Sequence, residues 1–309
     1  LYNMRWIKPV STLVLAGVFI FSAVSKIVAL DTFEVYIYQL GIFNFSWSAW
    51  LSRLLISAEL IIGLAFMLRF RLQLIWWLAL LSIFSFSLFL VYQLVIGSDQ
   101  NCFCFGELIE MSPAESLVKN LFILVLLVVS KGTAPWRFRF RTALFYVGLF
   151  AALLLPPIIS PPDSLIPGRI SEAQYNQEVL EDVMEQELIP GTVVNGRKIV
   201  CFYSTRCQYC QLCAGRLAAA FEQYDLSRDL MHIVFGSKGI PKAEEFFAET
   251  GSFHVQYTAL KPDDFLGITR GRMPLVLLMQ NGEVVEAWSY RQIDDQRLVS
   301  FLTAESFEE

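Results

Sequence analysis

Long apolar runs dominate the first half of the chain, and short polar stretches separate them. They cover residues 10–30, 48–68, 72–96, 117–130 and 142–159. A transmembrane helix needs about 17–25 mainly apolar residues, so four of the runs are long enough. The fourth run reaches that length only by extending backward through Lys119, whose long side chain would snorkel toward water. The pattern predicts five membrane-spanning helices.

The first run has an alternative interpretation as a signal peptide. Arg5 and Lys8 precede it, and Ala23-Val24-Ser25 resembles a cleavage site. Signal peptides carry a shorter apolar region of about 7–15 residues, so the length of this run favours a retained span.

A polar and proline-rich stretch follows the fifth run. Pro156-Pro157 and Pro161-Pro162 end the run, because proline lacks a backbone N–H and restricts the residue before it. Residues 160–170 are therefore expected to form a stiff linker. Ser171 and Gln174 have the spacing of a capping box, and an apolar stripe of helical period follows them. The stripe consists of Val179, Leu180, Val183, Met184 and Leu188.

The last part of the chain alternates strand and helix patterns. Strands are predicted at 199–204, 231–235, 275–279 and 283–288, and Asn281-Gly282 is typical of a hairpin turn. Helices are predicted from the Cys207 region to about 224, at 241–250 and at 294–302. This alternation predicts an α/β domain.

Charge divides the chain in the same place as hydropathy. Residues 1–159 contain 7 Asp or Glu and 11 Lys or Arg, whereas residues 160–309 contain 22 and 13. The second half is long enough for one core. The net charge of -5 gives no reason to expect nucleic-acid binding. The six cysteines fall in two clusters, which favours chemistry over a disulfide-stapled scaffold.

The charges between the runs predict an orientation. Positive residues precede the first run and lie between the second and third and between the fourth and fifth, whereas the other two loops contain only acidic charges. The positive residues are Arg5, Lys8, Arg69, Arg71, Lys131, Arg137, Arg139 and Arg141. The positive-inside rule then places the N-terminus in the cytoplasm. We predict a multi-pass protein of the cell inner membrane, with its C-terminal domain and the loop of Cys102 and Cys104 in the periplasm, where disulfides persist.

The membrane half resembles the DoxX/MauE group of four-helix membrane proteins over roughly residues 5–130. The stretch Phe21-Ser-Ala-Val-Ser-Lys26, followed by Asp31 and Phe33, is similar to the first-helix signature of that group. Cys102-Phe-Cys104-Phe-Gly106 resembles the cysteine loop of its MauE-like branch. The resemblance implies a role in disulfide formation or electron delivery to extracytoplasmic partners. A fifth span has no place in a four-helix unit and is expected to tether the next domain.

The second half resembles the thioredoxin fold across nearly all of residues 197–303. A strand runs into Cys207-Gln-Tyr-Cys210, which opens a helix, and Met273-Pro274 directly precedes a later strand. The resemblance implies that Cys207 is the exposed nucleophile, that Cys210 resolves, and that Met273–Pro274 is a cis peptide facing them. The predicted domains are 1–159 for the membrane bundle, 160–196 for a linker with a short helix, and 197–309 for the thioredoxin-like domain.

Physical chemistry supports the roles of the two cysteines independently. Attack on a disulfide requires thiolate, and a free cysteine has a pKa of about 8.5. A helix N-terminus presents unpaired N–H groups and a partial positive charge, which stabilise thiolate at Cys207. Arg206 is a candidate for additional stabilisation. Cys210 lies one helical turn on, a spacing that brings its sulfur back to the first.

Two cysteines depart from the thioredoxin pattern. Cys201 stands where the family often keeps a buried acid, and it is expected to be a small buried hydrophobe. Cys213 leaves three readings open: a core residue, a second resolving thiol, or a metal ligand within CxxCxxC.

The CxC motif is the second chemical pair. Disulfides in CxC pairs are strained and tend to be more oxidising, although two inert interfacial cysteines are the alternative. Phe103, Phe105 and the nearby acids suit a loop at the membrane surface. Because one chain carries Cys102/Cys104 and Cys207/Cys210 on one side, their effective concentration is expected to be high. We therefore predict an electron relay between them.

Glu59 and Lys26 are ionisable residues within predicted spans. An intramembrane acid is by default a functional hypothesis, and its structural alternative is pairing with Lys26, Arg53 or a hydroxyl. A quinone pocket lined by Glu59, Trp76 or Trp77 is a further hypothesis that no second feature supports. Quinone is thus a candidate cofactor, and no cofactor is certain.

The sequence favours an extracytoplasmic thiol–disulfide oxidoreductase that acts on protein thiols or disulfides. One rival is a non-catalytic membrane-complex subunit whose thioredoxin-like domain docks partners. Another is a metal-delivery protein that uses CxxCxxC.

Overall fold

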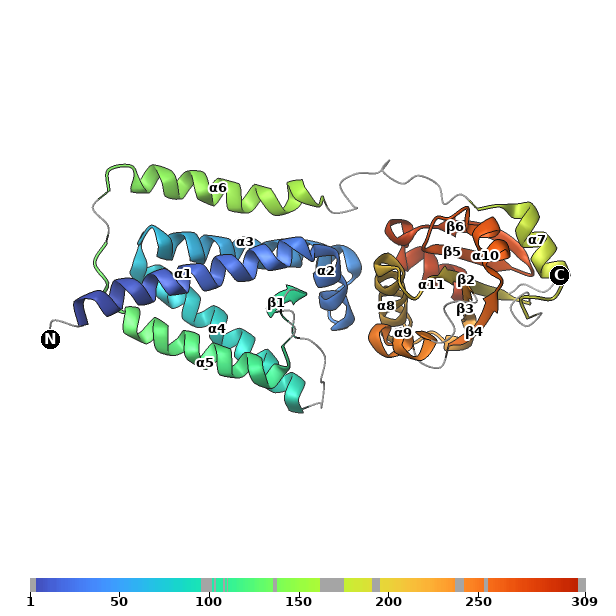
Figure 1. The fold of residues 1–309 in the computed structure, drawn as a ribbon, viewed down its shortest axis with the longest axis horizontal. Helices are drawn as coiled ribbons and strands as arrows, with labels where there is room; N and C mark the ends of the chain where they lie inside the picture. Colours follow the sequence, from blue (N-terminus) through green and yellow to red (C-terminus); the bar gives the residue numbers. More distant parts are fainter. Residues whose placement is uncertain are drawn as a thin grey trace. The chain divides into compact units, whose positions relative to one another are not determined.

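The computed structural model describes residues 4–95, 102, 104–107, 109, 111–135, 138–161, 175–190, 195–236, 242–252 and 255–304. Within them the chain falls into two compact units, one of long apolar helices and one built on a β-sheet (Figure 1). The predicted capping box at Ser171 and Gln174, together with Phe103, Arg137 and His254, lies outside the described residues.

Five helices of the first unit are long and apolar enough to cross a membrane. They are α1 (Met4–Val28), α3 (Phe45–Met67), α4 (Leu72–Val95), α5 (Pro113–Ser130) and α6 (Arg141–Ile159), and a short helix α2 (Leu30–Gln39) follows α1. The prediction of five spans is confirmed. The fourth span does extend backward through Lys119, because Ser112 and Glu115 form a capping box that starts α5 at Pro113.

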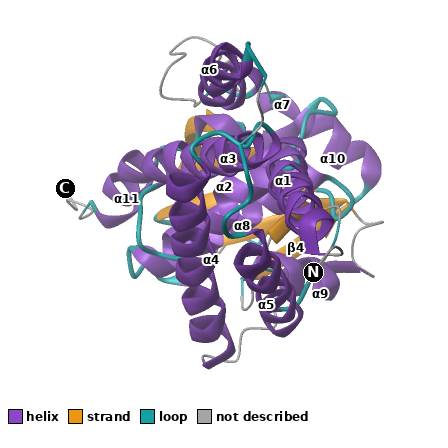
Figure 2. Ribbon diagram, turned by 90° about the vertical axis from the view of Figure 1, so that its left-hand side faces the viewer, coloured by secondary structure: helices purple, strands orange, loops and turns teal. Residues whose placement is uncertain are grey.

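The apolar helices pack around one shared core. Its fully buried members include Leu15 of α1, Ala65 of α3, Ala79 of α4 and Leu127 of α5. Helix α6 lies at the edge of the group in both views (Figures 1 and 2). Phe145 of α6 stacks on Phe70, with ring centroids 4.1 Å apart, and so joins α6 to the turn between α3 and α4. A four-helix core with a peripheral fifth span is thus the observed arrangement.

The second unit is a five-stranded mixed sheet in the order β4-β3-β2-β5-β6. Its strands are β2 (Arg197–Tyr203), β3 (Met231–Gly236), β4 (Gln256–Leu260), β5 (Leu275–Gln280) and β6 (Glu283–Trp288). Strands β2, β3 and β4 run parallel, whereas β5 is antiparallel to both β2 and β6. This topology is consistent with the predicted α/β thioredoxin-like fold.

Helices cover both faces of the sheet. They are α7 (Gln177–Glu185), α8 (Gln208–Gln223), α9 (Ala243–Thr250), α10 (Pro262–Thr269) and α11 (Asp295–Thr303). Val200 and Phe202 point to the face that α7 and α10 cover. Since strand residues alternate between faces, Cys201 and Tyr203 point to the opposite face, where Tyr203 contacts Cys213 of α8 and Phe246 of α9.

The pair β4 and α10 was not predicted from the sequence. Strand β4 is an edge strand whose first residues, Gln256 and Tyr257, are exposed, so it lacks the continuous apolar run of the inner strands. Helix α10 did carry a start signal, because Pro262 occupies its first turn with Asp263 and Asp264.

Candidate functional site: two cysteine pairs

Cys207 is the residue that begins α8. Strand β2 ends at Tyr203, and a tight turn closed by the hydrogen bond from Cys207 N–H to the Ser204 carbonyl leads into the helix. At this N-cap position the Cys207 sulfur accepts the backbone N–H of Cys210 at 3.3 Å. The sulfur therefore accepts the capping hydrogen bond that a serine or aspartate oxygen accepts at many helix starts.

The two sulfurs of the CxxC pair have different environments. Cys207 is partly exposed, whereas Cys210 is fully buried and accepts the Ser204 N–H at 3.5 Å. Both are free thiols in this structure. An attacking sulfur must be accessible, and a resolving sulfur needs only to reach its neighbour, so the arrangement matches the predicted division of roles.

The surroundings separate the two pKa values. The pKa of Cys207 is lowered to about 6, chiefly by a hydrogen bond from the Cys210 thiol and then by the N–H groups of Cys210 and Tyr209, against the effect of burial. Burial raises the pKa of Cys210 far above its ordinary value, and the bond to Cys207 raises it further. At neutral pH the pair therefore consists of a thiolate and a thiol. Arg206, predicted as a contributor, is exposed to solvent.

The cis peptide lies beside the end of β2. Met273–Pro274 is cis, as the thioredoxin resemblance implies. Phe202 pairs with Leu275 in the antiparallel ladder, so Pro274 comes level with Tyr203, next to the turn that leads to Cys207.

Two further cysteines form a buried cluster with Tyr203. Cys201 and Cys213 are fully buried, and the Tyr203 hydroxyl donates to the Cys213 sulfur at 3.3 Å. Burial raises the pKa of Cys213 to about 12 and that of Cys201 higher still. Buried protonated thiols are poor nucleophiles, so the structure places both residues in the core. The tyrosine contact is something the sequence analysis missed.

The metal reading of CxxCxxC finds no support in the described part of the chain. No group of three or more His, Cys, Asp or Glu side chains there could hold a metal ion. His232 is buried with one ring nitrogen 2.8 Å from the Thr258 hydroxyl, and burial lowers its pKa to about 4.

The second cysteine pair is a disulfide of the membrane unit, at the start of a short strand. Cys102 and Cys104 are bonded with their Cα atoms 5.4 Å apart, and Cys104 begins β1 (Cys104–Glu107). The two residues are only 1% and 3% exposed, and they pack against Leu90 of α4. The two cysteines are therefore buried by other residues of the chain, and the position of this loop at the membrane surface stays a prediction.

Gly106 allows β1 to lie against the backbone of α1. Its φ of +60° is a left-handed conformation, and a Cβ atom there would be 2.6 Å from the Ser25 carbonyl oxygen. Only glycine satisfies both conditions, which explains its place in the Cys-Phe-Cys-Phe-Gly motif.

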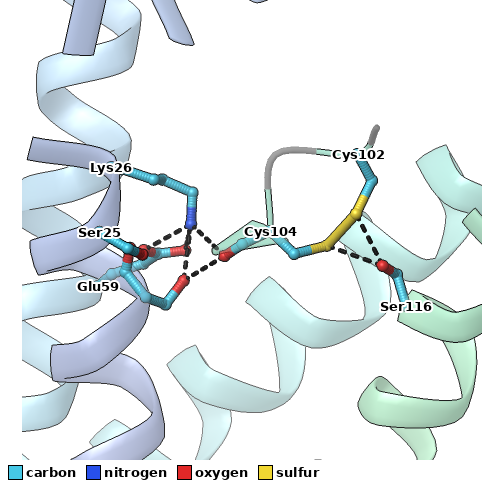
Figure 3. A network of polar contacts seen from close by, with 7 residues as sticks. Ser25, Lys26, Glu59, Cys102, Cys104 and Ser116 are labelled. Atoms are coloured by element: carbon cyan, nitrogen blue, oxygen red, sulfur yellow. Dashed lines mark hydrogen bonds and ion pairs between the residues drawn. A yellow bond between two sulfur atoms is a disulfide. The ribbon is translucent and has the colours of Figure 1, made fainter. Parts of the chain in front are cut away.

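A buried ion pair holds the carbonyl of Cys104 (Figure 3). The Lys26 ammonium lies 2.9 and 3.0 Å from the two Glu59 oxygens, 2.9 Å from the Cys104 carbonyl oxygen and 2.6 Å from Ser22 Oγ. Ser22 Oγ also donates to the same carbonyl at 2.8 Å. The structural alternative for Glu59, pairing with Lys26, is thus observed, and it includes a connection to the cysteine loop that the sequence did not reveal.

Two residues of α5 complete the surroundings of the disulfide. Ser116 Oγ lies 2.7 Å from Cys102 Sγ and 3.1 Å from Cys104 Sγ (Figure 3). The Lys119 ammonium, expected to snorkel, lies instead over the rings of Phe105 and Phe86, at 4.8 and 5.6 Å from their centroids. The spacing of Ser116 and Lys119 by three residues was the available sequence signal, because it places them on one helix face.

The residues of the quinone hypothesis have different surroundings. Trp77 lines a pocket of about 720 Å³ together with Arg69, Arg71 and Arg141, but Glu59 and Trp76 are not among its lining residues. The Trp76 indole N–H donates instead to the Leu127 carbonyl at 2.7 Å.

Comparisons with known proteins agree with this arrangement. Residues 4–131 match the family model described as "Methylamine utilisation protein MauE". The chain is 28% identical to "Protein TlpB" of Flavobacterium psychrophilum over 293 aligned residues, which cover 78% of this chain and 79% of that protein. No solved structure gave a significant match. The N-terminal part is thus similar to the MauE family of membrane proteins, and the similarity to the TlpB protein extends well beyond that part.

We expect alkylation of Cys207 by iodoacetamide to titrate with a midpoint near pH 6, because the reactive thiolate is present above its pKa of about 6 and is lost below it. In Cys210→Ala the midpoint should rise toward that of an ordinary thiol, since the strongest stabilising bond is removed. Mass spectrometry of the alkylated full-length chain gives the rate at each pH. Cys213 is the internal control, and a midpoint of 8 or more for the unaltered chain would contradict the prediction.

We expect Lys26→Met to destabilise the membrane unit by about 3–5 kcal/mol, because the mutation removes the partner of Glu59 and the hydrogen bond from Lys26 to the Cys104 carbonyl. Combining it with Glu59→Met should recover most of this loss. Thermal unfolding of the detergent-solubilised chain measures the effect, and Arg71→Met, at an exposed position, is the control. Equal midpoints for Lys26→Met and the control would show that the ion pair does not stabilise the fold.

Proposed function

We propose that this chain is a membrane-anchored thiol–disulfide oxidoreductase in which Cys207 exchanges disulfides with extracytoplasmic proteins. The observation that carries the proposal is the state of the CxxC pair: a partly exposed Cys207 with a pKa of about 6 next to a buried, protonated Cys210. A docking module has no need of such a difference in pKa, whereas disulfide exchange depends on it.

The exchange proceeds through two displacements. The Cys207 thiolate attacks a partner disulfide, forms a mixed disulfide and releases one partner sulfur as thiolate. Cys210, once deprotonated, attacks Cys207, which forms the Cys207–Cys210 disulfide and releases the second partner sulfur. Two electrons pass to the partner. Of the two protons that the partner gains, one comes from the Cys210 thiol and the other matches the proton that Cys207 gave to the solvent on forming its thiolate. The reverse sequence oxidises a partner dithiol.

The Cys102–Cys104 disulfide is the proposed second redox-active pair of an electron relay. It accepts two electrons from the reduced CxxC pair, which returns that pair to the disulfide form. The low exposure of both residues sets a condition on this step, because apolar side chains packed against the cysteines, such as Leu90, must move aside before another thiol reaches the sulfurs. The acceptor beyond this pair is a membrane component, for which quinone stays a candidate.

The arrangement of charges supports a common side for both pairs. Lys8, Arg69, Lys131 and Arg141 gather at one end of the apolar helices, where the Arg141 guanidinium reaches the Arg69 carbonyl and Thr133 lies near the Lys8 carbonyl. At the other end the Arg53 guanidinium, near the start of α3, donates to the carbonyl of Ser160, which follows α6. The chain therefore leaves α6 at the end opposite the basic residues, and the positive-inside rule assigns that end to the periplasm.

Replacing Cys207 with Ser should reduce the rate at which the solubilised chain reduces a fluorogenic disulfide peptide to the uncatalysed rate. Cys210→Ser should trap mixed disulfides with partner proteins in cells, since the resolving thiol is absent. Cys213→Ala is the matched control, because the Cys213 thiol belongs to the same helix but is buried. The activity of this variant should stay within about twofold of the parent. A Cys207→Ser variant that keeps both activity and partners would establish the docking rival instead.

The proposed orientation predicts that a membrane-impermeant maleimide labels Cys207 in intact cells. The control is Ala134→Cys in a chain without Cys207, because Ala134 is exposed in the connection between α5 and α6 at the basic end. This control should react only after the membrane is permeabilised. The reverse pattern of labelling would place the CxxC pair in the cytoplasm and overturn the relay.

A further inference from the structure

We propose that Ser116 is a catalytic residue of the Cys102–Cys104 pair and donates a hydrogen bond to the sulfur that leaves when the disulfide is reduced. This inference deepens the proposed function and rests on it, because it assumes that the pair accepts electrons. It starts from the position of one hydroxyl between two sulfurs in a closed site (Figure 3).

The direction of the hydrogen bond follows from the oxidation state. Neither sulfur of a disulfide carries a hydrogen, so the only hydrogen available in the contacts among Ser116, Cys102 and Cys104 belongs to the Ser116 hydroxyl. A serine in a helix often turns its hydroxyl back to the carbonyl four residues earlier. Here the hydroxyl oxygen lies within 2.7 and 3.1 Å of the two sulfurs.

The burial of the site makes this donor important. Ser116 is 0% exposed, and the cysteines are 1% and 3% exposed, so little water reaches the sulfurs in this arrangement. A thiolate that forms there loses most of its hydration, and a hydrogen bond to a charged group then has a larger effect than in water. The hydrogen bond from Ser116 thus stabilises the thiolate at the sulfur where its negative charge develops.

The shorter contact identifies the leaving sulfur. An incoming thiolate attacks Cys104 Sγ and forms a mixed disulfide, the bond between Cys104 and Cys102 breaks, and the electron pair stays on Cys102 Sγ beside the Ser116 hydroxyl. The second thiol of the reductant then attacks the mixed disulfide and releases Cys104. Two electrons enter the pair, and the two protons lost by the reductant match the two that the pair takes up.

The anchoring of the strand agrees with this assignment. The carbonyl of Cys104 is held by Lys26 and Ser22, so the attacked residue keeps its position while the bond breaks. Lys26 is a positioning residue here, because it acts through the backbone of Cys104.

The test uses the full-length chain with Cys207 and Cys210 both replaced by Ser, so that dithiothreitol reduces the Cys102–Cys104 pair without the other dithiol. Ser116→Ala should slow this reduction roughly tenfold to hundredfold, as expected for the loss of a hydrogen bond to a charged group. Ser116→Thr, which keeps a hydroxyl, should stay within a few-fold of the parent. The matched control is Ser130→Ala on the same helix, whose buried hydroxyl donates to the Leu127 carbonyl.

The direction in which Ser116→Ala changes the rate of disulfide reduction distinguishes a catalytic role of Ser116 from a structural one. If Ser116 only holds the bundle closed, its removal loosens the site, exposes the disulfide and makes reduction faster. An unchanged or faster rate in Ser116→Ala, or a Ser116→Thr variant as slow as the alanine variant, overturns the proposal. A slower rate supports it even when the parent chain shows no activity at Cys207, so this result and the failure of the proposed function remain distinguishable.

The mixed disulfide gives an independent check. When a monothiol such as glutathione replaces dithiothreitol, peptide mass spectrometry should find the adduct on Cys104 with Cys102 free. An adduct mainly on Cys102 would overturn the assignment of the leaving sulfur.

Discussion

Polar groups within the apolar helices have to find their partners inside the chain, because the bilayer core offers no water to replace them. The structure satisfies this constraint with two buried ion pairs, Lys26 with Glu59 and Arg53 with Glu34. Each cation also holds a backbone carbonyl, that of Cys104 in one case and that of Ser160 in the other. The charged residues therefore determine where the cysteine strand lies and where the chain leaves the last span.

The two cysteine pairs differ in their access to solvent and in the groups that surround their sulfurs. Cys207 needs access to partners and a low pKa, which the start of α8 supplies through its N–H groups and the buried Cys210 thiol. Cys102 and Cys104 are closed off from water, and their sulfurs lie among the Ser116 hydroxyl and apolar side chains such as Leu90. An exposed dithiol suits exchange with many proteins, whereas a closed disulfide suits exchange with a selected partner.

Many features of the fold could be predicted from local patterns in the sequence. The five spans and the CxxC motif at a helix start each depend on a few neighbouring residues, so a single sequence reveals them. The cis Met273–Pro274 peptide was expected from the resemblance to the thioredoxin fold. Strand β4 was not predicted, because an edge strand with exposed side chains lacks a continuous apolar run in the sequence. The burial of the two CxC cysteines was not evident from the sequence for a related reason, because it depends on packing against Leu90 of another helix.

By itself, then, the sequence determined which residues form the spans and which cysteines lie close enough along the chain to form pairs, since these features follow from hydropathy and short spacings. Only the tertiary structure decided what surrounds the sulfurs. The contact from Lys26 to the Cys104 carbonyl joins residues 78 positions apart, and the contact from Ser116 to Cys102 joins helix α5 to the cysteine loop that precedes it. Such contacts depend on how the helices pack, and no local pattern encodes that packing.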